Sequence, residues 1–137
     1  MIAQDIRQRF LVVDDDHSLR TVLSIALESR SDAEVIGASD GLEALRLIES
    51  MDLSVVFVDL LMPKMTGAEM LNALNDHPNL PKIVVMTALE EALADQPLAD
   101  QSLVAQLRYL GASKVLKKPF HIGEFFSVVD ELTAVAV

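Results

Sequence analysis

The stretch FLVVDDDHSLRTVLSIAL, residues 10–27, changes its hydrophobic pattern at the three aspartates in its middle. Before them, residues 10–13 are apolar at consecutive positions, which is typical of a parallel strand buried on both faces. After Asp16, a candidate N-cap, the apolar side chains recur at helical spacing. They are Leu19, Val22, Leu23, Ala26 and Leu27, while Arg20, Glu28 and Arg30 take the other face. The stretch predicts a strand followed by a helix.

The same unit recurs along the whole chain. Further strands are predicted at 33–37, 55–58, 83–86 and 114–116, and further helices at 41–50, 66–74, 103–110 and 120–132. Strict alternation of this kind indicates an α/β fold, a doubly wound parallel sheet of five strands with five helices on its two faces. No linker of low complexity divides the chain. We therefore expect one domain over residues 1–137, with a core at about 8–133.

Composition argues against several classes of function. The chain contains no cysteine, so it can form neither disulfides nor thiolate metal sites. Its net charge of −10 opposes the neutralisation of phosphates on which nucleic-acid binding depends, so direct binding to DNA or RNA is not expected. No apolar run approaches the ~20 residues that span a bilayer. We expect a soluble cytoplasmic protein with no membrane segment.

Carboxylates follow two of the predicted strands. Asp14 and Asp15 directly follow the first strand, and Asp59 follows the third. In such sheets ligands bind beyond the carboxyl ends of the strands, where neighbouring carboxylates would repel one another. A hard divalent cation such as Mg²⁺ relieves that repulsion. A plainer interpretation, in which each aspartate only caps a helix or makes a turn, stays open for Asp14 and Asp15 and is the favoured one for Asp16.

Two further polar residues follow the remaining strands. Thr87 comes after the fourth strand and Lys118 after the fifth. An ammonium group and a hydroxyl beside carboxylates and a cation can hold the oxygens of a transferring phosphoryl group while Asp59 attacks as the nucleophile. The pattern therefore favours a phosphoryl-transfer site.

Over residues 10–132 the sequence resembles the CheY-like receiver domains of two-component response regulators. The resemblance rests on LVVDDD (11–16), ASDGLEAL (38–45), VDLLMPKMTG (58–67), TA (87–88), GA (111–112) and KKPF (117–120). It implies a flavodoxin-like sheet with the strand order 2-1-3-4-5. It also implies a cis peptide bond between Lys118 and Pro119, and structural roles for Pro63 and Gly67 in the loop after Asp59.

The resemblance further implies the role of each site residue. Asp59 would accept the phosphoryl group, and Thr87 and Lys118 would contact it. Mg²⁺, for which Mn²⁺ could substitute, would be bound directly by Asp15 and through water by Asp14. The full implied ligand set is Asp14, Asp15, Asp59 and the backbone carbonyl of Leu61.

The sequence departs from the family pattern at several positions. Val115 stands where many receivers carry an aromatic switch residue, and Leu61 and Leu89 stand where polar side chains often orient an attacking water. The segment at 88–101 is longer than usual and acidic. It is either a solvated extension of the surface or a functional one, and both interpretations stay open.

The expected function is a signalling module and not an enzyme. A histidine kinase or histidine phosphotransfer protein would phosphorylate it, and phosphorylation would alter its binding to a downstream protein, as a monomer or a phosphorylation-dependent homodimer. One alternative is a phosphohydrolase like the haloacid dehalogenases, but Leu61 occupies the position of their second aspartate. Another is an adaptor that works without phosphorylation, against which the set of Asp59, Thr87 and Lys118 argues.

Overall fold

The computed structural model describes residues 8–30, 33–62, 64–88 and 97–133. Within them, five parallel strands form one sheet in the order β2-β1-β3-β4-β5. The strands are β1 (Gln8–Val13), β2 (Ala33–Ala38), β3 (Val55–Asp59), β4 (Lys82–Thr87) and β5 (Lys114–Lys117). The helices are α1 (His17–Glu28), α2 (Gly41–Ser50), α3 (Gly67–Ala73), α5 (Pro97–Tyr109) and α6 (Ile122–Thr133). The predicted fold class and strand order are confirmed.

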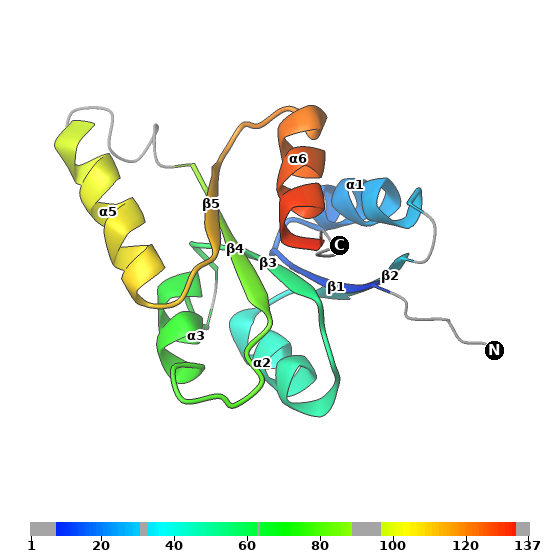
Figure 1. The fold of residues 1–137 in the computed structure, drawn as a ribbon, viewed down its shortest axis with the longest axis horizontal. Coiled ribbons are helices and arrows are strands. Elements are labelled where there is room, and N and C mark those ends of the chain that lie inside the picture. The colour runs from blue at the N-terminus through cyan, green and yellow to red at the C-terminus, as the bar shows by residue number, and fades with distance from the viewer. Residues whose placement is uncertain (1–7, 31–32, 63, 89–96, 134–137) are drawn as a thin grey trace.

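Helices cover both faces of the sheet (Figure 1). Side chains of α1 and α6 pack on one face, together with Phe57 of β3. Those of α2, α3 and α5 pack on the other, together with Val56 and Val58 of the same strand. Because β1, β3 and β4 are buried on both faces, their apolar residues run consecutively in the sequence.

Aromatic rings join the sheet to α6. The Phe57 ring centroid lies 4.8 Å from that of Phe125, a buried residue of α6, and 6.4 Å from that of Phe10. Full burial of one such side chain contributes about 1.5–3 kcal/mol, so this cluster anchors α6 across the central strands.

Most predicted elements begin and end within two residues of the observed ones, but α5 does not. It starts at Pro97, well before the predicted residue 103, so part of the acidic segment at 88–101 is helical. Proline suits the first position of a helix because its missing N–H would have no partner there. Residues 89–96, which include Leu89, lie outside the described part of the chain. Helix α6 begins at Ile122, two residues later than predicted.

Helix caps fix the loops at the carboxyl edge of the sheet. The Asp16 side chain accepts hydrogen bonds from the N–H groups of Ser18 and Leu19, which confirms its interpretation as the N-cap of α1. Thr66 and Glu69 form a capping box at the start of α3. Among the described residues, no helix has the length and hydrophobicity needed to cross a membrane.

Candidate functional site

The register of the sheet brings the predicted site residues to one edge. Val13 pairs with Val58, so Asp14 emerges from β1 beside Asp59 at the end of β3. Thr87 at the end of β4 pairs with Lys117, so Lys118 follows immediately beside it. Residues far apart in the sequence therefore meet beyond the carboxyl ends of the central strands.

Three carboxylates form the centre of the site. Asp14, Asp15 and Asp59 each offer an oxygen, and these oxygens all lie within 4.8 Å of one another. Asp14 is fully buried, Asp59 is partly buried and Asp15 is exposed. Hard oxygen donors with uncompensated negative charge are the donor set that Mg²⁺ prefers. The residues present thus fit a magnesium ion.

Lys118 contributes a positive charge to this cluster. Its Nζ lies 3.0 Å from Oδ2 of Asp14 and 3.5 Å from Oδ2 of Asp59. The Lys118–Pro119 peptide bond is cis. Thr87 is buried, and its carbonyl oxygen accepts a hydrogen bond from the Lys118 N–H at 2.7 Å. The predicted Thr87 and Lys118 thus lie side by side at the end of the sheet.

The charges shift the titration of two site residues. Burial raises the pKa of Asp59, and repulsion by Asp14 raises it further, against the opposing attraction of Lys118. Burial alone would lower the pKa of Lys118, but its hydrogen bond to Asp14 and the attraction of Asp59 outweigh that effect and raise it. Lys118 therefore stays positively charged. Its single charge does not balance the negative charges of the three carboxylates.

The loop after Asp59 is held close to the strand end. Leu60 donates a backbone hydrogen bond to Met86, and Gly67 donates one to Leu60, both at 2.8 Å. A Cβ on Gly67 would lie 3.0 Å from the carbonyl oxygen of Asp59, a tighter contact than most Cβ atoms make, so this approach favours glycine. Leu61, whose N–H lies 3.4 Å from Oδ1 of Asp59, is 67% exposed. Pro63 lies outside the described residues.

Sequence reasoning missed one residue of this edge. Arg20, expected on the outer face of its helix, reaches back over the loop and donates a hydrogen bond to the carbonyl oxygen of Asp14 at 2.6 Å. The available signal was its position in the first turn of α1, four residues after Asp16, but the pattern of polar and apolar residues does not separate such a contact from a solvated side chain.

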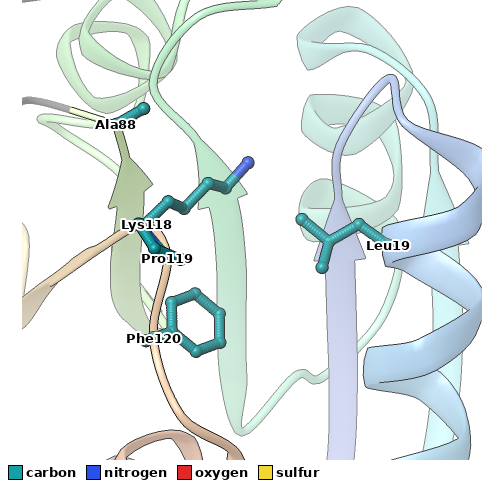
Figure 2. Close-up of a pocket in the computed structure, with 5 residues that line it drawn as sticks. All are labelled: Leu19, Ala88, Lys118, Pro119 and Phe120. Carbon is teal, nitrogen blue, oxygen red and sulfur yellow. The ribbon is translucent and has the colours of Figure 1, made fainter. Parts of the chain in front are cut away.

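An apolar cavity opens beside the site. It has a volume of about 430 Å³ and is lined by Leu19, Ala88, Lys118, Pro119 and Phe120. In Figure 2, Phe120 and Leu19 face each other across the gap, and the Lys118 side chain extends past them with its nitrogen at the upper end. The site therefore adjoins an apolar wall.

The chain is similar to known proteins over most of its length. The family model described as the response regulator receiver domain matches residues 10–130. The probable chemotaxis protein CheY of Rhizobium etli is 31% identical over 131 residues, which cover 94% of this chain and 93% of that protein. The solved chemotaxis response regulator CheY4 of Vibrio cholerae is 27% identical, with a TM-score of 0.77 over 92% of this chain and 98% of that one.

Other relatives are longer proteins. The DNA-binding response regulator MtrA of Mycobacterium leprae is 36% identical over 84% of this chain, but the match covers 46% of MtrA. The chain thus spans less than half of that relative. MtrA is a DNA-binding response regulator by name, so the expectation that this chain does not bind nucleic acid stays a prediction.

Proposed function

The chain belongs to the family of response regulator receiver domains, and from this we propose that it accepts a phosphoryl group on Asp59 and thereby changes its affinity for a partner protein. The donor is the phosphorylated imidazole of a histidine kinase or a histidine phosphotransfer protein. The observation that carries the proposal is the meeting of Asp14, Asp15, Asp59 and Lys118 at one edge of the sheet.

In the proposed reaction, a carboxylate oxygen of Asp59 attacks the phosphorus. The bond from phosphorus to the donor nitrogen breaks, and its electron pair leaves with the imidazole. Lys118 is already within 3.5 Å of Asp59 and compensates charge on the transferring group. Thr87 would donate a hydrogen bond from its hydroxyl to a phosphoryl oxygen. Mg²⁺, when bound, supplies further positive charge, because that of Lys118 alone does not balance the carboxylates and the phosphoryl group.

The metal would be held by the carboxylates and by the carbonyl of Leu61. Asp15 is exposed, which suits a direct ligand. Asp14 already accepts hydrogen bonds from the Asp16 N–H at 2.9 Å and from Lys118, which suits contact through a water. Mn²⁺ has similar ligand preferences and is expected to substitute.

A phosphohydrolase is the less favoured function for this site. Hydrolysis of an aspartyl phosphate requires a group that activates water, and the position two residues after Asp59 carries the apolar Leu61. We therefore assign the domain a signalling role in which the phosphoryl group persists. The downstream partner is proposed to be a protein, since the net charge of −10 disfavours nucleic acid.

The test is incubation with acetyl phosphate and Mg²⁺, followed by measurement of the intact mass. The parent should gain the mass of one phosphoryl group, and Asp59→Asn should not. Asp16→Asn is the matched control, because asparagine also caps helices and Asp16 lies outside the carboxylate trio. Modification that persists in Asp59→Asn would overturn the assignment.

A further inference from the structure

Arg20 contacts the acidic loop in a way that the proposed reaction does not require. One terminal nitrogen of its guanidinium group donates to the carbonyl oxygen of Asp14 at 2.6 Å. The other lies 3.1 Å from Nδ1 of His17. Because a guanidinium group has donors and no acceptor, Arg20 is the donor in this contact with His17. The side chain is thus held at two points.

We propose that Arg20 is a positioning residue of the metal site, which fixes the peptide between Asp14 and Asp15 and so directs the Asp15 carboxylate. This inference rests on the metal-dependent function proposed above. It concerns the affinity of the site for a divalent cation and not the phosphoryl-transfer step itself.

The first argument is that Asp14 is fixed through every polar group except this carbonyl. Its N–H donates to the carbonyl of Ala38 at 3.1 Å, and its carboxylate oxygens accept from the Asp16 N–H at 2.9 Å and from Lys118 at 3.0 Å. The hydrogen bond from Arg20 immobilises the remaining group. The orientation of the next peptide plane is then determined by Arg20.

The second argument concerns Asp15. Its side chain is exposed at the rim of the site, so packing does not restrain it as burial restrains Asp14. Its direction depends on the backbone from which it projects. Groups that orient a metal ligand from outside the coordination sphere commonly change metal affinity by about 10–100-fold. Arg20 acts on the backbone of this ligand in that manner.

The third argument is that the fold provides room for Arg20. Gly37 in β2 lies under the side chain, and a Cβ built there would be 3.8 Å from both Cδ and Nε of Arg20. A methyl group would therefore be tolerated, but a longer side chain would occupy the path of the arginine. Gly37→Leu should displace Arg20 without altering a residue of the loop, which gives a second and independent perturbation.

The experiment is a titration of the full chain with Mn²⁺, followed by electron paramagnetic resonance of the free ion. Arg20→Met should bind Mn²⁺ about tenfold more weakly than the parent. Arg20→Lys keeps the charge but not the two-pronged geometry, so its affinity should lie between the two. Gly37→Leu should resemble Arg20→Met. The control is Arg46→Met, which removes an exposed arginine of α2 and should leave the affinity unchanged.

A kinetic measurement separates positioning from a general structural role. In Arg20→Met the Mg²⁺ concentration for half-maximal phosphorylation should rise about tenfold, in proportion to the lost affinity, while the rate at saturating Mg²⁺ should change less than about twofold. Thermal unfolding in EDTA checks that each variant is folded. A merely structural role would lower the unfolding temperature and leave the Mg²⁺ dependence unchanged.

The outcomes distinguish this inference from the proposed function. Unchanged Mn²⁺ affinity in both Arg20→Met and Gly37→Leu would overturn the role of Arg20 and leave the function standing. A parent that binds Mn²⁺ but is never phosphorylated would overturn the function, and the titration would still decide the role of Arg20. A parent that binds no Mn²⁺ would overturn both.

Discussion

Asp59 belongs to a cluster of three carboxylates beside one lysine. Its pKa is raised by burial and by Asp14, so the folded protein without metal binds a proton on Asp59 more tightly than the unfolded chain does. The free energy of unfolding should therefore fall as the pH rises from about 4, the ordinary pKa of aspartate, through the raised pKa of the folded state. At neutral pH the ionised side chain destabilises the metal-free fold.

Asp59→Asn removes this titration while keeping the shape of the side chain. In EDTA at pH 7 the variant should unfold at a higher temperature than the parent, and the difference should shrink as the pH approaches about 4. Addition of Mg²⁺ should raise the unfolding temperature of the parent more than that of the variant. Thermal unfolding followed by circular dichroism at several pH values measures both effects. A parent as stable as the variant at every pH would contradict the charge balance described here.

Leu61 is an exposed apolar residue two positions after Asp59. Its exposed side chain offers no hydrogen bond to a water that could attack the phosphoryl group. Leu61→Asn should speed loss of the phosphoryl group by about fivefold, since one net hydrogen bond of about 1 kcal/mol in the transition state corresponds to that factor. The decay of the phosphorylated mass over time measures it. The control is Leu42→Asn, which replaces an exposed leucine of α2. Its phosphorylated form should decay at the rate of the parent.

At the scale of elements, α3 is joined to the site through its first residue. A Cβ on Gly67 would lie 3.0 Å from the Asp59 carbonyl oxygen and 3.1 Å from Cα of Leu60, and backbone atoms cannot yield as a flexible side chain does. Gly67→Ala should lower the free energy of unfolding by about 1–3 kcal/mol, as overpacking commonly does. It should also weaken Mn²⁺ binding, because the displaced backbone carries Asp59.

Gly123 of α6 provides the matched comparison. A Cβ there would meet no atom within 4 Å, so alanine gains helix propensity without a clash. Gly123→Ala should raise the free energy of unfolding by about 0.5–1 kcal/mol. Urea unfolding of the two variants measures both changes. If both substitutions stabilise the protein, the close approach of α3 to Asp59 does not constrain the loop.

The elements also show how far the sequence predicts the structure. Local patterns predicted α2 with its observed bounds and the N-cap at Asp16, since both depend on neighbouring residues. Other features depend on tertiary contacts. Val22 was expected to face inward but is 56% exposed. The buried core residues of α1 are Leu23 and Leu27, which lie four residues apart on a neighbouring face of the helix. The early start of α5 at Pro97 had no apolar periodicity to indicate it.

In the site, too, some features could be predicted from local sequence and others depend on tertiary contacts. Asp14, Asp15, Asp59, Thr87 and Lys118 could be predicted because each lies at the end of a strand or just beyond it, and parallel strands end at one edge. The distances of a few ångströms between these side chains follow from the register of the sheet. That register cannot be predicted from the sequence alone. The hydrogen bond from Arg20 to Asp14 depends on a side chain folding back over the loop and on the space above Gly37 in β2. Neither has a signature in a hydrophobic pattern.

Across the whole molecule, β4 links the proposed phosphoryl site to the proposed output surface. Thr87 ends this strand within the site, and the chain then continues through the acidic segment at 88–101 into α5. We propose that residues 88–101, the rest of α5 with the adjoining Leu110, and β5 near Val115 form the face that binds the downstream partner. Val115 offers no aromatic ring to swing inward, so the signal requires a different carrier.

Thr87 itself can carry the signal. If its hydroxyl bonds a phosphoryl oxygen, binding at the site favours one position of Thr87 at the end of β4, and this shifts the population of conformers of the chain that continues from it. Beryllofluoride, a phosphoryl mimic, should therefore slow amide hydrogen exchange at residues 88–110. Asp59→Asn, which cannot bind the mimic as the parent does, should show no such change. Protection confined to the loops at Asp14, Asp59 and Lys118 would mean that the site does not communicate with this face.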